Sequence, residues 1–449
     1  MPRLFWHTPP MCTTFPTFDQ VIAHLDARGF FHMELGLERM EQALARLFPV
    51  RPPLVCVQVI GTNGKGSTAA FLDSLARSHG LRTGLYTSPH FVSPAERIRL
   101  DGVPLPEEAW PALAEEVYAA CPELTYFEFL TVLALLAFAR HGVELAVLEA
   151  GLGGRHDATT ACPADALCYA PIALDHAAIL GPTLAHIAAD KAAAIRSAAP
   201  VFSAPQYPAA RAALEAVAAA HDAPLTFVEP LPPAVPFGLA GPHQRINAAV
   251  ALAAWRALAP RFGHAALPAS AAPTPPEAGG LAHAFIAGRL QSLPACEAHP
   301  PLLLDGAHNP HGMQALARHL RQMGQAPRCA IFSCLADKDW LPAARLLQKE
   351  LGDIPLLVPQ LHNERAADAS AVAAACNAGR ACPTARAVPD VASALAAARD
   401  ISPAAADGGA PVVLCGSLYL LAEFFSLFPR YLTAPAGSDP APAHAEARA

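Results

Sequence analysis

The 449-residue sequence predicts an α/β fold in two parts, a larger N-terminal domain on a parallel sheet and a smaller C-terminal α/β domain. Short apolar runs alternate with helix-length segments along most of the chain, which is typical of a doubly wound parallel sheet. An Ala- and Pro-rich stretch at 258–280 interrupts this alternation, and a second series begins near Gly288. We therefore predict domains at 1–286 and 287–432, followed by a disordered tail at 433–449.

Each predicted strand is a short apolar run that ends in Gly, Pro or polar residues, and each predicted helix spaces its apolar residues three or four apart. The predicted N-terminal strands are 55–60, 81–86, 145–149, 166–174, 199–203 and 225–228. The predicted helices between and around them are 17–25, one ending near 48, 68–78, 107–120, 125–140, 183–195 and 248–257. In the C-terminal part we predict strands at 302–304, 329–334, 354–358 and 412–415, with helices ending near 322 and 428.

The composition excludes several classes of protein. Hydrophobic residues make up 53% of the chain, yet no uninterrupted apolar run approaches the roughly 18 residues of a membrane span. The first ten residues have no apolar signal core, and the eleven cysteines are scattered without a C-x-x-C pair, so we expect free thiols in the cytoplasm. With a net charge of −7 and no basic block, we expect no nucleic-acid partner.

The segment at 55–67, VCVQVIGTNGKGS, is the strongest local signal. A buried strand, a glycine-rich loop with a lysine and a helix in this order build a cradle of backbone N–H groups for phosphate. Lys65 would meet the β- and γ-phosphates, and Ser67 would offer a hydroxyl to phosphate or metal. The loop departs from the usual Walker pattern, because Gly66 separates Lys65 from Ser67. A plain strand-to-helix turn is the alternative, but such a turn does not call for a lysine between two glycines.

Three further polar residues follow predicted strands: Ser88, Glu149 and His176. Parallel strands bring their carboxyl ends to one edge of a sheet, which is where open α/β sheets bind ligands. A hydroxyl, a carboxylate and an imidazole beside a phosphate loop indicate a site for ATP and Mg²⁺. Taken singly, each of these residues is more typical of a turn or of a structural role; their shared position after successive strands favours the site.

At this level of detail the chain resembles the dihydrofolate synthase/folylpolyglutamate synthase family of the Mur ligase superfamily. The matching segments run in family order from about residue 17 to 428. They are LGLERM at 35–40, GTNGKGS at 61–67, YTSPH at 86–90, ERIRLDG at 96–102, TYFEFLT at 125–131, LEAGLGGRHDAT at 148–159, LDH at 174–176, DKA at 190–192, HQRINAA at 243–249, GRLQ at 288–291, LDGAHNPHG at 304–312, LADKD at 335–339 and GSLYL at 416–420. The resemblance implies a P-loop ATPase-like N-terminal domain and a Rossmann-like C-terminal domain.

The resemblance also implies a role for each matched residue. The ATP contacts would be Gly61, Thr62, Asn63, Gly64, Lys65, Gly66, Ser67, Gln244, Asn247, Arg289 and Asp305. Ser88, Glu149 and His176 would hold one or two Mg²⁺ ions. Lys191 would carry a carbamate, and His308 would assist catalysis together with Lys65 and Lys191. The pterin-bearing substrate would contact Met33, Glu34, Leu35, Thr125, Tyr126, Phe127, Glu128, His156, Asp157 and Ala158.

The implied activity is ATP-dependent addition of L-glutamate to dihydropteroate and to tetrahydrofolates through an acyl phosphate, by a monomeric enzyme. An enzyme with only one of the two activities, a folylpolyglutamate synthase, is an alternative. His156 stands where many members have an apolar residue, and this departure bears on the fine substrate preference. A muramyl-peptide ligase fits less well, since LGLERM and TYFEFLT match the folate branch. A nucleotide-binding protein without catalysis is disfavoured by the intact Lys65, Ser88, Glu149 and His176.

Overall fold

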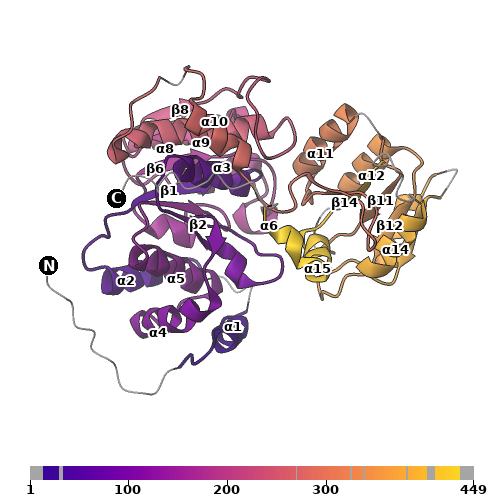
Figure 1. The fold of residues 1–449 in the computed structure, drawn as a ribbon, viewed down its shortest axis with the longest axis horizontal. Coiled ribbons are helices and arrows are strands. Elements are labelled where there is room, and N and C mark those ends of the chain that lie inside the picture. The colour runs from indigo at the N-terminus through magenta and orange to yellow at the C-terminus, as the bar shows by residue number, and fades with distance from the viewer. Residues whose placement is uncertain are drawn as a thin grey trace, which may run out of the picture.

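The structure, a computed structural model, describes residues 14–29, 34–268, 270–323, 326–336, 338, 340–380, 383–401 and 410–434. Two lobes lie side by side, each a sheet with helices on both faces (Figure 1). The predicted tail from 435 onward and the predicted substrate contact Met33 lie outside the described residues. Among the described helices, none combines the length and the apolar composition that crossing a bilayer requires.

The N-terminal lobe contains an eight-stranded sheet in the order β4-β3-β2-β5-β1-β6-β7-β8. Its strands are β1 (Val55–Ile60), β2 (Thr83–Tyr86), β3 (Ile98–Leu100), β4 (Val103–Pro104), β5 (Leu145–Glu149), β6 (Ala166–Tyr169), β7 (Val201–Ser203) and β8 (Leu225–Phe227). Its helices are α1 (Phe18–Ala27), α2 (Glu38–Leu47), α3 (Lys65–Ser78), α4 (Trp110–Ala120), α5 (Tyr126–Arg140), α6 (Ala177–Leu180), α7 (Leu184–Ala192), α8 (Pro208–Ala220), α9 (Gln244–Leu258) and α10 (Pro275–His283).

The C-terminal lobe contains a six-stranded sheet in the order β13-β12-β11-β14-β10-β9. Its strands are β9 (Gln291–Leu293), β10 (Leu302–Leu304), β11 (Cys329–Phe332), β12 (Leu356–Pro359), β13 (Ala385–Val388) and β14 (Val412–Cys415). Its helices are α11 (Pro310–Gln322), α12 (Trp340–Leu351), α13 (Ala369–Asn377), α14 (Val391–Ile401) and α15 (Leu418–Leu427). The two-part α/β prediction is confirmed.

Burial on both faces explains why the central strands of the N-terminal sheet are continuous apolar runs. Every residue of β1 and of β5 is buried. Helix α5 packs with α2 and α4 on one side of the sheet, and α3 packs with α9 and α10 on the other (Figure 1). A strand covered on both faces has no polar side to alternate with, which is typical of parallel sheets.

Several predicted boundaries are wrong for local reasons. Helix α3 begins at Lys65 rather than 68, because Gly64 takes a left-handed conformation (φ 94°) that ends the loop there. Helix α9 begins at Gln244 rather than 248. Strand β6 ends at Tyr169 rather than 174, since Pro171 has no N–H to continue a ladder. The sheets are also mixed: β3 and β4 form an antiparallel edge of the first sheet and β9 an antiparallel edge of the second.

The Ala- and Pro-rich stretch is held in place by a buried ion pair. Arg256 on α9 donates from Nε and Nη2 to the two carboxylate oxygens of Glu277 on α10, at 2.8 and 2.9 Å. Its guanidinium also donates to the carbonyl oxygens of Pro268, Ala271 and Ala272. Both charged side chains are almost fully buried, at 4% and 1% exposed. One arginine therefore orders a segment whose sequence predicts little regular structure.

We predict that Arg256→Met lowers the free energy of unfolding by about 3–5 kcal/mol, because it leaves the Glu277 carboxylate buried without a cationic partner. Urea unfolding followed by circular dichroism measures the change. Arg211→Met is the matched control, since Arg211 pairs with Glu215 on the surface of α8, where both are about half exposed. That change should stay within about 0.5 kcal/mol, and an equal loss in the two variants would contradict the role of burial.

Candidate functional site

The phosphate loop, residues 61–67, follows β1 and ends in the first turn of α3. A Cβ atom on Gly64 would lie 2.5 Å from Oδ1 of Asn247, and one on Gly66 would lie 2.8 Å from Cδ1 of Ile286. A side chain at either position would displace these neighbours, and the left-handed Gly64 also favours glycine. Lys65 folds back over the loop and its Nζ donates to the carbonyl oxygen of Thr62 at 3.3 Å. This is the geometry of an anion cradle at a helix N-terminus.

Two buried amides on the first turn of α9 line the back of this loop. Gln244 donates from Nε2 to the Ser67 hydroxyl at 3.2 Å and accepts at Oε1 from Nδ2 of Asn247 at 2.8 Å. Asn247 in turn lies against Gly64. The structure thus brings together four of the residues predicted to contact ATP, Gly64, Ser67, Gln244 and Asn247, and it holds the Ser67 oxygen against Gln244, behind the loop.

Glu149 lies at the end of β5, buried beside the phosphate loop. Its Oε2 accepts a hydrogen bond from the backbone N–H of Ser88 at 3.0 Å, and it lies 3.4 Å from the position of a Cβ on Gly66. Burial raises the pKa of Glu149, while the charge of Lys65 and the Ser88 N–H oppose that rise. A cation bound next to this carboxylate would stabilise its charged form and offset the cost of burying it.

His176 lies on the turn between β6 and α6. It is exposed, takes a left-handed conformation (φ 52°) just before α6, and its Nε2 lies 3.9 Å from Asp175 Oδ1. The part of the ring that packs against its neighbours is desolvated, and this partial burial, opposed by the charge of Asp175, lowers the pKa of His176 to about 4, so its imidazole is neutral near pH 7. Within the described residues, no three His, Cys, Asp or Glu side chains gather to hold a metal ion.

The residues present nevertheless fit a magnesium nucleotide. Mg²⁺ takes few protein ligands and keeps water and phosphate oxygens, so one carboxylate, a hydroxyl and a neutral imidazole beside a phosphate cradle suffice. The observation behind this fit is the buried Glu149 carboxylate next to glycine positions that a Cβ would fill. Ser88, Glu149 and His176 remain the predicted ligands.

Lys191, on α7, is 4% exposed, and its Nζ lies 3.5 Å from the carbonyl oxygen of Gly153. Burial, with a further contribution from the charge of Lys65, lowers the pKa of Lys191 to about 7. A large fraction of this amine is therefore neutral and nucleophilic near pH 7. The loop in front of it is tied to α7 by Asp190, whose Oδ2 accepts from the Gly154 N–H at 2.9 Å.

The predicted substrate residues divide into two groups. Phe127 is half-buried and lies against Gly151, where a Cβ would come within 2.7 Å of its ring. Tyr126 is buried under the Arg97 guanidinium, 5.5 Å from the ring centroid. Glu34, Leu35 and His156 are exposed, with Leu35 at 73%. Glu34 is also ion-paired with Arg39, whose Nη1 lies 3.0 Å from its Oε2. The two rings are thus packed against the protein, whereas Leu35 and His156 lie on its surface.

The predicted acidic substrate contacts instead shape the backbone. Glu128 accepts from Arg39 at both carboxylate oxygens, at 3.1 and 2.9 Å, and from the Thr125 N–H as the capping box of α5. Asp157 accepts from the N–H groups of Leu152 and Thr159 and so closes the glycine-rich loop, with Ala158 buried behind it. Sequence reasoning missed Arg39, although it stands within the LGLERM motif.

In the C-terminal lobe, Asp305 organises the turn that carries Arg289. Its two oxygens accept from the N–H groups of Leu290 and Ala307, both at 2.9 Å. Arg289 then lies across Gly306, where a Cβ would clash with its Nη1. His308 points back to the other lobe, with Nε2 3.7 Å from Oδ2 of Asp175.

Asp175 is the centre of a contact between the lobes that the site prediction omitted. Lys338 Nζ lies 3.0 Å from its Oδ1, and Asn309 Nδ2 donates to its Oδ2 at 2.9 Å. Burial alone would raise the pKa of Asp175, but the hydrogen-bonding interaction with His308, the neighbouring His176 and the Lys338 ammonium hold it well below its usual range. The three segments that meet in this contact all lie in motifs that match the family, LDH, LDGAHNPHG and LADKD. These matches were the sequence signal from which Asp175 could have been included in the predicted site.

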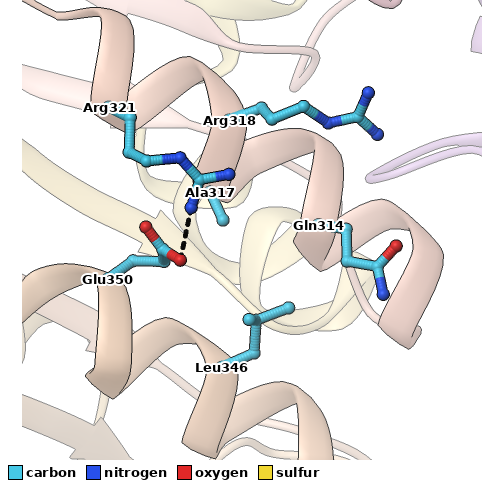
Figure 2. A pocket seen from close by; sticks show the side chains of 6 residues that line it. All are labelled: Gln314, Ala317, Arg318, Arg321, Leu346 and Glu350. Carbon is cyan, nitrogen blue, oxygen red and sulfur yellow. Dashed lines mark ion pairs between the residues drawn. The ribbon is translucent and has the colours of Figure 1, made fainter.

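A separate pocket of about 320 Å³ lies between α11 and α12, away from these residues. Figure 2 shows Arg321 pointing to its ion-pair partner Glu350 across the pocket, with Arg318 turned away from both. Because the Arg321 charge is already neutralised and none of the predicted site residues lines this pocket, we do not assign the activity to it.

Comparison with known proteins identifies close relatives. Residues 288–418 match the family described as "Mur ligase, glutamate ligase domain". The chain is 34% identical over 358 residues to the Bacillus subtilis dihydrofolate synthase/folylpolyglutamate synthase, covering 71% of this chain and 81% of the relative. It superposes on Escherichia coli FolC in complex with DHPP and ADP at a TM-score of 0.78, with 27% identity over 94% of this chain and 99% of the other. A bifunctional Yersinia pestis folylpolyglutamate synthase/dihydrofolate synthase complexed with AMPPNP and Mn ion matches at 0.78, with 28% identity over 94% and 100% of the chains.

The lowered pKa of Lys191 predicts a pH dependence of stability. Its pKa is about 7 in the fold against an ordinary 10.5, so between these values the unfolded chain binds more protons and the free energy of unfolding rises with pH. Relative to Lys191→Met, the wild type should gain on the order of 2 kcal/mol between pH 7 and 9 in urea unfolding, in CO₂-free buffer without nucleotide. Lys349→Met, at an exposed site on α12, is the control. Parallel wild-type and Lys191→Met profiles would contradict the assignment.

Proposed function

The chain belongs to the dihydrofolate synthase/folylpolyglutamate synthase family, and from that membership we propose that it joins L-glutamate to dihydropteroate and to folates with the cleavage of ATP to ADP and phosphate. The observation that carries the proposal is the phosphate cradle at 61–67 with the buried Glu149 beside it. In Yersinia pestis and Escherichia coli, related structures hold AMPPNP with Mn ion, and DHPP with ADP.

In the first step the substrate carboxylate attacks the γ-phosphate of ATP, and ADP leaves as an acyl phosphate forms. The N–H groups at the start of α3 and the Lys65 ammonium bind the phosphates and offset the charge that moves onto the leaving oxygen. Ser88, Glu149 and His176 would hold one or two Mg²⁺ ions, which supply further positive charge there. Gln244, Asn247, Arg289 and Asp305 would orient the nucleotide from both lobes.

In the second step the amine of L-glutamate attacks the acyl carbon, the new C–N bond forms and phosphate leaves. The attacking amine must lose a proton, and His308, half-buried at the lobe junction, is our candidate to accept it. Contact between the lobes keeps water from the acyl phosphate, which would otherwise hydrolyse.

We further propose that Lys191 carries a carbamate. Its neutral amine would add to the carbon of CO₂, forming an N–C bond and releasing one proton, and the resulting anion would face the metal site. The support is the burial of Lys191 behind the 151–154 loop together with the neighbouring charge of Lys65.

Finer proposals on the domains, the oligomeric state and the location complete the assignment. Residues 1–286 bind ATP and the pterin substrate, and residues 287–432 act as the glutamate ligase domain. The enzyme works as a monomer in the cytoplasm, without nucleic acid. Light scattering on the purified protein tests the oligomeric state.

Assays with different acceptor substrates for L-glutamate test the proposed function directly. The purified protein should release ADP with dihydropteroate, ATP and L-glutamate, and mass spectrometry should detect dihydrofolate. A second assay replaces dihydropteroate with tetrahydrofolate. Turnover with tetrahydrofolate alone would identify a monofunctional folylpolyglutamate synthase, whereas ADP release only with a UDP-linked muramyl acceptor would contradict the proposal.

Lys65→Ala should lower kcat/KM for ATP by about a thousandfold, because it removes the ammonium that stabilises charge on the phosphates. ADP release under steady-state conditions measures this loss, and an unchanged melting temperature shows that the fold is retained. Lys349→Ala, on the exposed face of α12, should stay within about twofold of wild type. Full activity of the Lys65 variant would refute our placement of the phosphate loop.

A further inference from the structure

Asn309 is buried where the two lobes meet, at 5% exposed, and its side-chain amide contacts three segments. Its Oδ1 accepts from the Gly312 N–H at 2.8 Å, which caps α11 in the C-terminal lobe. Its Nδ2 donates to Asp175 Oδ2 at 2.9 Å and to Asn63 Oδ1 at 3.1 Å, both in the N-terminal lobe. Asn63 in turn donates a longer hydrogen bond, from its Nδ2 to Asn309 Oδ1 at 3.3 Å. The amide thus uses both of its protons and both of its lone pairs.

The hydrogen-bonding groups around Asn309 fix which of its two amide atoms, Oδ1 or Nδ2, faces each neighbour. The Gly312 N–H can only donate, so the atom that faces it must be Oδ1, and the ionised Asp175 carboxylate can only accept, so the atom that faces it must be Nδ2. The orientation of Asn63 follows, because its Oδ1 must accept from Asn309. Asn63 Nδ2 then donates to Nδ1 of His311 at 2.9 Å, which places the imidazole proton on Nε2.

The two N-terminal segments that Asn309 contacts are also joined to each other. The N–H of Thr62 donates to the carbonyl oxygen of Pro171 at 2.9 Å. The Thr62 hydroxyl donates to the Ala173 carbonyl oxygen and accepts from the Ala173 N–H, both at 3.0 Å. The start of the phosphate loop and the 171–176 turn therefore form one unit. Lys65 follows this unit at one end, and His176 lies at the other.

We propose that Asn309 is a positioning residue through which the C-terminal lobe sets the place of both the phosphate loop and the Asp175–His176 turn. The catalytic importance of that placement rests on the proposed function, whereas the structural coupling does not. When the lobes meet, the single side chain at the N-cap of α11 aligns the two segments that carry Lys65 and His176. The Lys338–Asp175 contact at 3.0 Å holds the same turn from a second point of the C-terminal lobe.

Two substitutions separate this role from the capping of α11. Asn309→Asp keeps an oxygen for the Gly312 N–H but turns the donor that faces Asp175 into a second carboxylate oxygen. Asn309→Ser keeps a capping hydroxyl and is too short to reach Asp175 and Asn63. Asn377→Asp is the matched control, because Asn377 pairs with Ala385 wholly within the C-terminal lobe.

Hydrogen exchange of the full-length, ligand-free protein tests the coupling. We expect the amides of Thr62, Asn63 and Ala173 to exchange at least about fivefold faster in both Asn309 variants, with the amides of α11 unchanged. The Asn377 variant should match wild type at these amides. Unchanged exchange in the Asn309 variants, or equal acceleration in the control, would overturn the proposal.

Steady-state kinetics test the consequence for catalysis. Both Asn309 variants should lose about tenfold or more in kcat while the KM of the pterin acceptor stays within about twofold, because the acceptor site is not displaced. An unaltered kcat alongside faster exchange would overturn the positioning role. If the wild type itself shows no ligase turnover, the proposed function fails, and the exchange data still decide whether Asn309 couples the lobes.

Discussion

The parallel pairing of β1 with β5 and β6 is the constraint on which the rest of the site depends. Val59 lies opposite Glu149, and Ile60 lies opposite Tyr169, so the three strands end at the same level of the sheet. The phosphate loop, the Glu149 carboxylate and the 171–176 turn consequently share one edge. No side chain has to reach far, since the backbone register has already placed the groups together.

Burial at this edge disfavours the charged forms of ionisable side chains, and neighbouring charges in the chain offset this cost only in part. Glu149 and Lys191 are both almost fully buried, and each pKa is displaced toward the neutral form, upward for the acid and downward for the amine. Lys65 favours the charged form of Glu149 and disfavours that of Lys191. A site built in this way gains most from a ligand that brings both anionic phosphate and a divalent cation.

Other carboxylates near the site serve the backbone. Glu128, Asp157 and Asp305 each accept from backbone N–H groups, and each holds a turn that presents other residues. Asp305 is instructive, because it was predicted as an ATP contact and both of its oxygens are occupied by N–H groups beside Arg289. Its influence on a ligand would pass through the turn that positions Arg289. Resemblance to a motif thus locates a site residue without specifying what its atoms touch.

The sequence by itself determined the two-part α/β fold, the position of the phosphate loop and the presence of polar residues at or beyond the carboxyl ends of β2, β5 and β6. These features are local: apolar runs mark buried strands, and a lysine flanked by glycines marks the loop. Only the tertiary structure decided which partners these residues have. Arg39 meets Glu128 across 89 positions, and Asn309 meets Asn63 across 246. Such pairs leave no periodic signal, because they arise only where packing brings distant turns together.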